Sequence, residues 1–222
     1  MDIVEAIRSR KSIRGYKPDP VPNEILREIL EIATRAPSAM NTQPWEITVV
    51  TGETLDNLRK GNVEMLTSGV TPHPEVPRKS YEGKYRQRQV DLAIQIFELL
   101  DIDREDKEQR FEWMQKGFRF FDAPAAFILS ADKSVGEFQV VLDTGILVQT
   151  ICLTALNYGL GTCIENQGVM FPEVVRKFLD IPESKRLITS IAIGYPDWDF
   201  PANKVVSARE PLENIVTWYS DA

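Results

Sequence analysis

The sequence predicts an α+β fold in which helices surround one central sheet, mixed or antiparallel. Segments with helical apolar spacing outnumber strand-like segments, which lie far apart along the 222 residues. Strict alternation of strand and helix is missing, which disfavours a doubly wound parallel sheet. The apolar segment 137–158 predicts a helix roughly 33 Å long, which we expect at the centre of the fold or of an interface.

The N-terminal quarter predicts two helices and a strand. Residues 2–10 have apolar side chains at helical spacing and predict a short amphipathic helix. Residues 10–20 follow as a basic stretch with turn residues. Residues 22–36 predict a second helix, opened by a proline and ended by Pro37. Residues 45–51 are rich in β-branched side chains and predict a strand.

The middle of the chain predicts three helices before the next strand. Residues 53–67 have helical spacing, and residues 68–79 form a loop with three prolines. Residues 81–100 and 104–121 predict helices with strongly polar faces. Residues 124–131 are apolar and predict a buried strand.

The remaining elements complete a single domain spanning residues 1–222. After the long helix, residues 160–165 predict a short strand and residues 172–179 a helix. Residues 187–195 predict a strand that ends in a turn. Residues 196–222 show little regular pattern and several prolines, so we expect an arm rather than a second domain.

Composition excludes several classes of function. The net charge of −7 disfavours sequence-independent binding of nucleic acid. His73 is the single histidine and lies in a turn-rich stretch, which suggests an ordinary loop residue. Cys152 and Cys163 lack the CxxC spacing of redox or zinc sites. We therefore expect no metal site and a reducing, cytoplasmic environment.

Targeting signals are not evident. The N-terminus is acidic and lacks an apolar run, which argues against a signal peptide. The segment 137–158 carries polar side chains, among them Asp143 and Asn157. We therefore expect a buried helix of a soluble protein there and no association with a membrane.

A basic cluster follows the first helix. Arg10, Lys11 and Arg14 place three cations around Ser12 within five residues. Guanidinium forks, an ammonium group and a hydroxyl are the donors that a phosphate prefers. The plainer alternative is a solvated basic run, which spacing alone would favour.

Three further segments offer groups for a ligand. Residues 36–45 place small and amide side chains between two prolines, and residues 157–166 contain glycines that allow close approach of the backbone. Arg209 is a candidate second contact for a phosphate. The plainer alternatives are an ordinary connection, a helix C-cap at Gly159 and a surface arginine.

Taken in order, these segments form a more specific pattern. R-x-S-x-R near residue 10 is followed by P-S-x-x-N-x-Q-P-W, the long helix, G-L-G-T, I-G-Y-P and a final arginine before Pro-Leu. This pattern covers nearly the whole chain, and it resembles the nitroreductase family of FMN-dependent oxidoreductases. Each motif is modest alone, but their common order makes the resemblance strong.

The resemblance implies a nitroreductase-like α+β homodimer with C-terminal arms exchanged between subunits and two FMN molecules at the interface. It implies NADH or NADPH as electron donor and nitroaromatic or quinone acceptors, reduced in a ping-pong cycle at the flavin N5. The flavin then supplies the redox chemistry, so no catalytic side chain is expected. Residues 61–121 would form a variable lid or substrate channel.

The resemblance also implies which residues bind FMN. The ribityl chain, the phosphate and the polar edge of the ring would be held by Arg10, Lys11, Ser12 and Arg14, with Arg209 completing the phosphate site. The partner subunit would contribute Pro37, Ser38, Ala39 and Asn41. The segment beside the ring would be Cys163, Ile164, Glu165 and Asn166, where Asn166 replaces a frequent glycine of the family.

Other interpretations stay open at this stage. The same fold could serve a dehalogenase or a metabolite dehydrogenase, and a non-catalytic FMN-binding protein would carry the same motifs. Arg86 and Arg88, among the aromatic residues of the variable region, could admit a flat anionic substrate. The alternative is a lid helix with a solvated outer face.

Overall fold

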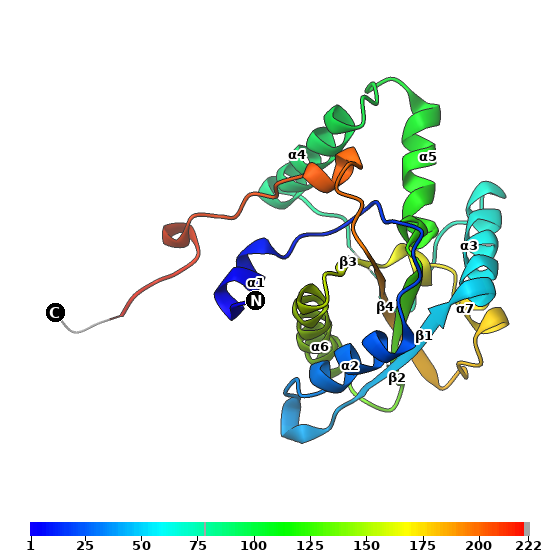
Figure 1. Ribbon diagram of the computed structural model, residues 1–222, viewed down its shortest axis with the longest axis vertical. Helices are drawn as coiled ribbons and strands as arrows, with labels where there is room; N and C mark the ends of the chain where they lie inside the picture. Colours follow the sequence, from blue (N-terminus) through cyan, green and yellow to red (C-terminus); the bar gives the residue numbers. More distant parts are fainter. Residues whose placement is uncertain (78, 220–222) are drawn as a thin grey trace.

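A computed structural model describes residues 1–77 and 79–219, and one four-stranded antiparallel sheet lies at the centre of this part of the chain (Figure 1). The strand order is β1 (Trp45–Thr51), β2 (Ala125–Asp132), β4 (Lys185–Gly194) and β3 (Gly161–Glu165). The predicted α+β class is confirmed, and of the two expected kinds of sheet the antiparallel one forms. The predicted strand 187–195 starts two residues earlier, at Lys185.

Alternate side chains of the central strand β2 pack into two different hydrophobic cores, one on each face of the sheet. Phe127 and Leu129 pack with helices α2 (Asn23–Ala33) and α6 (Glu137–Asn157) on one face of the sheet. This division follows from the pleat, which points successive side chains to opposite faces. Because both faces are covered, seven of the eight β2 residues are buried, which explains the continuous apolar run in the sequence.

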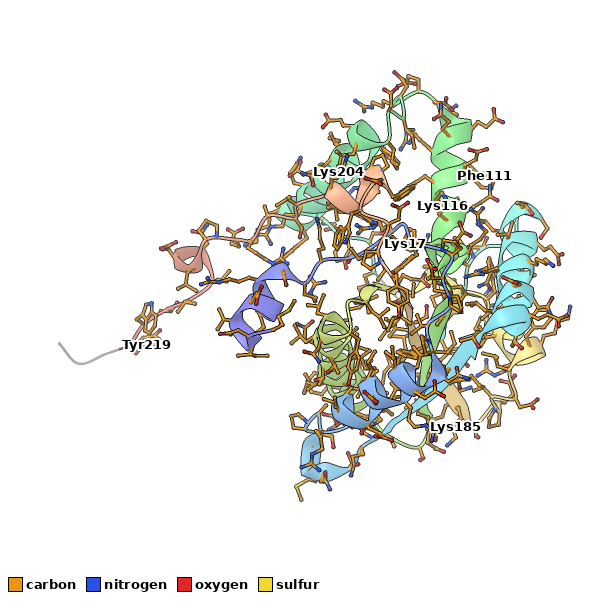
Figure 2. All side chains as sticks on the ribbon, in the orientation of Figure 1. Lys17, Phe111, Lys116, Lys185, Lys204 and Tyr219 are labelled. Carbon is orange, nitrogen blue, oxygen red and sulfur yellow. The ribbon has the colours of Figure 1, made fainter. Side chains whose placement is uncertain are left out.

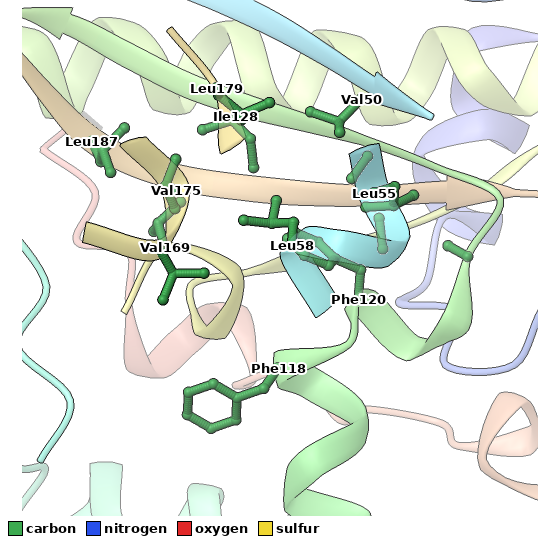
Figure 3. Close-up of a cluster of buried hydrophobic side chains, with 14 of the residues drawn as sticks. Val50, Leu55, Leu58, Phe118, Phe120, Ile128, Val169, Val175, Leu179 and Leu187 are labelled. Carbon is green, nitrogen blue, oxygen red and sulfur yellow. The ribbon is translucent and has the colours of Figure 1, made fainter. Parts of the chain in front are cut away.

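The opposite face of the sheet packs on α3 (Gly52–Thr67) and α7 (Pro172–Phe178). Figure 3 shows Val50 and Ile128 of the sheet against Leu55 and Leu58 of α3, with Val175 of α7 beside them. Phe120 is fully buried in the same cluster, at the end of the segment that leads into β2. This core therefore holds both the sheet and the turn that precedes β2.

The long central helix α6 is confirmed. Eight of its residues are buried, among them the charged residue Asp143. By length and composition alone it could also cross a membrane, but it packs on the sheet as a core helix. Its first two turns nevertheless expose Phe138, Val141 and Leu142.

Two helices lie at one end of the layered body, and the C-terminal end of the second packs into the core through Phe118. Figure 1 shows α4 (Gly83–Leu99) and α5 (Lys107–Phe118) at one end of the molecule. The helix predicted for 104–121 is shorter at both ends. Asp106 caps its N-terminus by accepting the Gln109 N–H, and left-handed φ angles at Phe120, Phe121 and Asp122 end it.

The N-terminal helices also differ slightly from expectation. The first, α1, spans Ile3–Ser9. The second was predicted to reach residue 36 but ends at Ala33, because the N–H groups of Arg35 and Ala36 turn back to carbonyls three residues earlier. Beyond β4 the chain makes the short turns η4 (Pro201–Lys204) and η5 (Leu212–Asn214), and Figure 1 shows it leaving the body as an arm.

Candidate functional site: a basic stretch beside strand β3

The basic stretch that follows α1 lies along the edge strand β3. Ser12 forms a parallel bridge with Thr162, and the Ile13 N–H donates to the Thr162 carbonyl at 2.9 Å. Ile13 is buried, and a Cβ on Gly161 would lie 2.4 Å from its side chain. Glycine is therefore required at position 161 for the two segments to approach so closely.

A buried asparagine fixes the backbone around Arg14. The Asn203 side-chain oxygen accepts the Arg14 N–H at 2.6 Å, and its amide donates to the carbonyls of Gly15 and Asp197 at 2.7 Å each. The Arg14 side chain makes one long contact, 3.5 Å, with the Ser12 carbonyl. The guanidinium is thus left half-buried beside the cavity, with its main chain held in place.

The end of β3 is rigid. The Glu165 carboxylate accepts the Gly168 N–H at 3.1 Å and the Ser190 hydroxyl at 2.8 Å. Asn166 accepts a 2.6 Å hydrogen bond from the Thr189 hydroxyl. These hydrogen bonds engage the polar side chains of Glu165 and Asn166 within the fold. Ile164, which is 43% exposed, presents an apolar side chain to the outside.

The cysteine of this segment, Cys163, is an unreactive thiol. Burial raises the pKa of the Cys163 thiol to about 12, although Arg14 acts in the opposite direction. The thiol is therefore neutral near pH 7 and does not serve as a nucleophile, which requires the thiolate.

One cavity of about 550 Å³ joins the two motifs. Arg14 lines it together with residues 163–166, and Met114, Phe118 and Phe121 form an apolar wall opposite. A pocket of this size, apolar with a charged edge, suits a planar cofactor with an anionic tail. Arg14 of the first motif and residues 163–166 of the third therefore line one cavity within one chain.

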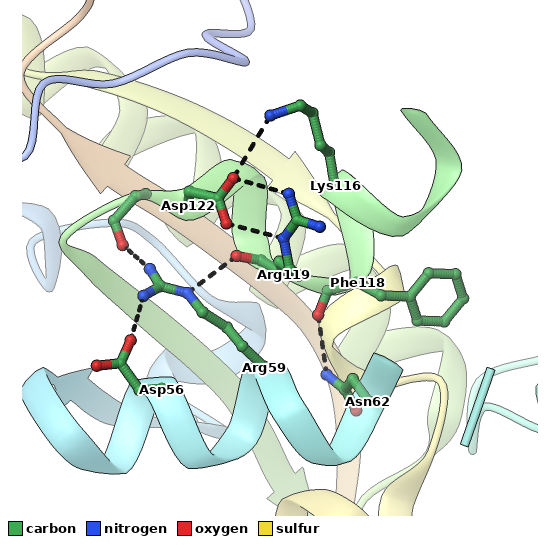
Figure 4. A network of polar contacts seen from close by, with 8 residues as sticks. Asp56, Arg59, Asn62, Lys116, Phe118, Arg119 and Asp122 are labelled. Atoms are coloured by element: carbon green, nitrogen blue, oxygen red, sulfur yellow. Dashed lines mark hydrogen bonds and ion pairs between the residues drawn. The ribbon is translucent and has the colours of Figure 1, made fainter. Parts of the chain in front are cut away.

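The apolar wall depends on a strained turn that polar contacts hold in place (Figure 4). Phe120, Phe121 and Asp122 have φ angles of 56°, 52° and 58°, which are unfavourable for side chains of this size. From α3, the Arg59 guanidinium donates to the Arg119 carbonyl at 3.1 Å. Arg119 in turn binds the Asp122 carboxylate through two hydrogen bonds of 2.9 and 3.1 Å.

The loop at residues 37–41 lies away from the cavity lined by Arg14 and residues 163–166. The turn η1 (Ala39–Asn41) is exposed, and Figure 1 shows it at the opposite end of the body from α4 and α5. The buried Asp143 carboxylate of α6 accepts the Ala39 N–H at 3.2 Å, and the Ser38 hydroxyl accepts the Gln43 N–H at 2.9 Å. Positive φ angles at Met40 and Asn41 show that the loop is held in a defined, strained shape.

Comparisons with known proteins agree with this geometry. The family model described as "Nitroreductase family" matches residues 7–195. A nitrobenzene nitroreductase of Ectopseudomonas oleovorans is 32% identical over 220 residues, covering 97% of this chain and 96% of the relative. A 4-nitrobenzoate reductase of Pseudomonas putida is 31% identical, covering 96% and 94%.

A solved structure shows the same fold. The FMN and NADPH-dependent nitroreductase NfnB from sphigopyxis sp. strain HMH superposes with a TM-score of 0.94 at 28% identity and covers 100% of both chains. The chain belongs to the nitroreductase family. The resemblance read from the motifs is thus confirmed for family and fold.

Within this nitroreductase chain, the predicted site residues fall into three groups. Ser12 bridges to Thr162 and Arg14 lines the cavity with residues 163–166, whereas Arg10 and Lys11 precede them in the chain and do not line that cavity. Residues 37–41 do not line that cavity. Arg209 lies on the arm beside α4, where its guanidinium donates to Ser207 and to the Ala208 carbonyl.

Sequence reasoning missed the residues that support this nitroreductase site. Asn203 and Asp143 bind backbone N–H groups of the predicted motifs, and both side chains are buried. Nothing distinguishes Asn203 from other polar loop residues in the sequence. Asp143 offered one signal, because a carboxylate in the most apolar helix needs a partner when it is buried.

Proposed function

We propose that this protein is an FMN-dependent NAD(P)H oxidoreductase that reduces nitroaromatic or quinone acceptors by two electrons. The observation that supports this most directly is the shared cavity of Arg14 and residues 163–166. Arg14 supplies a cation to its lining. The neighbouring Arg10, Lys11 and Ser12 offer further donors, of the kind that match a phosphate and the polar rim of a flavin. The relatives that act on nitrobenzene and 4-nitrobenzoate support the choice of acceptor.

In this mechanism the chain binds and positions, and FMN when bound supplies hydride transfer between donor and acceptor. Arg10, Lys11 and Arg14 would hold the anionic tail of FMN, and their charge would favour a group that gains negative charge on reduction. Phe118 and Phe121 line the same cavity and would exclude water from the space in which donor and acceptor bind. Cys163 and Glu165 are engaged in the fold and are assigned no proton transfer.

The proposal includes a homodimer in the cytoplasm, with each site completed by the partner's copy of residues 37–41. The arm supports this, since Leu212, Ile215 and Trp218 are 56%, 65% and 78% exposed within one chain. The uncovered apolar start of α6 supports it too. Large exposed apolar surfaces of this kind mark interfaces. Residues 61–121 would form the substrate channel of the assembled enzyme.

The first test is a visible absorption spectrum of the purified protein, reconstituted with FMN, during anaerobic addition of NADPH and then of NADH. We expect a yellow protein that bleaches with at least one donor and recovers its colour when nitrobenzene or a quinone is added. Steady-state data should give parallel double-reciprocal plots for donor and acceptor. A protein that does not bind FMN would overturn the proposal, and a yellow protein without turnover would indicate a non-catalytic flavoprotein.

A further inference from the structure

A second cavity adjoins the first, between α4 and α5. It has a volume of about 570 Å³, which is within the usual range for small-molecule sites. The two cavities share four lining residues, which are Arg14, Met114, Phe121 and Gln167. A molecule stacked in the first cavity could therefore extend a substituent into the second.

The second cavity is strongly cationic. Arg14, Lys107 and Arg110 line it, and no carboxylate is among the lining residues that the structure describes. Within residues 1–77 and 79–219, none of these three cations takes part in an ion pair with Asp or Glu. Arg14 is assigned to FMN in the proposed function. In a protein with a net charge of −7, the other two uncompensated cations of this pocket, Lys107 and Arg110, indicate a further anionic ligand.

The cations at Arg86 and Arg88, which the sequence suggested for this role, are used differently. Arg88 is paired with Glu210 of the arm, and Arg86 donates to Gln89 at 2.6 Å on its own helix. Neither lines the cavity between α4 and α5. The available charge comes instead from α5, whose first turn carries Lys107 and Arg110.

The rest of the cavity suits an aromatic ring. Phe111 and Met114 are 39% and 40% exposed although they belong to the same helix as the cations, and Figure 2 labels Phe111 on this helix. The ring of Trp113 lies 5.9 Å from that of Phe121 at the border with the first cavity. Exposed apolar side chains beside unpaired cations match a ligand that is flat, apolar and negatively charged at one end.

Arg110 is already oriented for such a ligand. Its guanidinium lies over the Phe97 ring, 5.2 Å from the centroid, and donates to the Arg104 carbonyl at 2.9 Å. These two contacts restrain the side chain and leave further N–H donors for a carboxylate. Less conformational entropy is then lost when an anion binds.

We propose that the cavity between α4 and α5 is an acceptor subsite in which Lys107 and Arg110 bind the carboxylate of an aromatic acid. The inference rests on the proposed function and names its substrate class: the acceptor is a nitro-substituted aromatic carboxylate rather than a neutral nitroaromatic. Lys107 and Arg110 are specificity residues and take no part in the redox step. The acceptor's ring lies on the side of Trp113 and Phe121, towards the first cavity.

The test compares two acceptors that differ by a single carboxylate, 4-nitrobenzoate and nitrobenzene, with FMN-loaded enzyme at saturating donor. In the double variant Lys107→Gln/Arg110→Gln we expect KM for 4-nitrobenzoate to rise at least tenfold. KM for nitrobenzene and for the donor, and kcat for both acceptors, should stay within about twofold. Arg110→Lys should retain part of the preference because it keeps the charge.

The matched control is Arg86→Gln/Arg88→Gln, which removes the same charge from the neighbouring helix and should leave the ratio of the two KM values unchanged. Equal increases of KM for both acceptors in the α5 variant would overturn the proposal. So would an increase confined to KM of the donor, which would assign the cations to a phosphate of the dinucleotide.

Binding of unreactive benzoate to the FMN-loaded enzyme, measured by calorimetry, separates this proposal from the proposed function. If the wild type reduces neither acceptor, the proposed function fails, and the subsite is still judged by binding. Benzoate that binds the wild type and the α4 control at least tenfold more tightly than the α5 variant supports the subsite. Equal affinities for all three proteins would overturn it.

Discussion

The two regions predicted to hold the cofactor differ in how completely one chain builds them. The basic stretch is joined to β3 by a backbone bridge, and its Arg14 lines one cavity together with residues 163–166. The loop at residues 37–41 is held just as firmly, through Asp143, but faces solvent and lines no part of that cavity. This difference is the basis of our proposal that one chain supplies one half of each site and a partner subunit supplies the other half.

Removal of the arm after Val205 has the largest expected effect on this arrangement. Because the arm exposes several large apolar side chains, burying each against a partner would contribute roughly 1.5–3 kcal/mol. We expect the truncated protein to be monomeric by light scattering and to lose FMN on gel filtration.

A point variant guards against misfolding of the truncated chain. Ile215→Glu/Trp218→Glu alters only side chains that are exposed within one chain, so the fold of the monomer should be retained by circular dichroism. It should nevertheless dissociate the dimer. A truncated protein that stays dimeric and yellow would show that the arm does not join the two halves.

Arg14→Gln tests the part of the proposed FMN site that is formed by the basic stretch and the end of β3. Its main-chain contact with Asn203 stays, so the fold should be unaffected, but one charge-assisted contact to an anionic ligand is lost. Such a contact contributes about 1.5–3 kcal/mol, so FMN affinity should fall roughly tenfold to a hundredfold in a fluorescence titration. Arg8→Gln, which removes an exposed cation from α1, is the control and should bind FMN normally.

Asp143→Ala tests the part of the proposed FMN site that the loop at residues 37–41 would supply. It removes the carboxylate that accepts the Ala39 N–H, so the free energy of unfolding should fall by about 1–3 kcal/mol and the loop should lose its shape. FMN affinity should then fall although Asp143 does not line the cavity.

Mixed dimers make this comparison decisive. In a dimer of one Arg14→Gln chain and one Asp143→Ala chain, one site combines both defects and the other has none. We expect half of the sites to bind FMN with wild-type affinity. If both halves of a site came from the same chain, every site would carry one defect and no wild-type sites would appear.

These regions also show what the sequence could reveal. Arg10–Arg14 and residues 163–166 could be proposed from the sequence because each is a short contiguous motif, and the bridge between Ser12 and Thr162 brings these two segments side by side. The order of helices and strands followed from apolar periodicity, but the end of α5 did not. That end depends on three left-handed residues that α3 holds in place through Arg59.

Ion pairs between residues far apart in the chain could not be predicted from the sequence. Arg88 and Arg110 look alike in the sequence, yet Arg88 is neutralised by Glu210, which is 122 positions away. Asn203 and Asp143 act through backbone N–H groups, so their roles depend on the fold rather than on a pattern. The sequence thus predicts which groups are present but not which of them remain unpaired.

The smallest expected effect concerns the loop between α3 and α4, whose Pro72 lines the first cavity. The His73 ring contacts the Thr71 carbonyl and the Glu173 carboxylate, each at 3.0 Å. The contact with Thr71, helped by Glu173, raises the pKa of His73. Folding therefore favours the protonated ring, and the resulting stability is fully present below the unfolded-state pKa of about 6.5.

This contribution is lost as the pH rises through the higher pKa of the folded state. His73→Gln should thus lower Tm most at low pH, by about 1–4 °C, because the pair is exposed and contributes less than about 1 kcal/mol. The difference should shrink towards pH 8.5 in thermal melts, and Glu173→Gln should weaken the same pH dependence. FMN affinity should hardly change, since neither half of the site includes this pair. A cost that grew with pH would mean that the neutral ring is the form the fold favours.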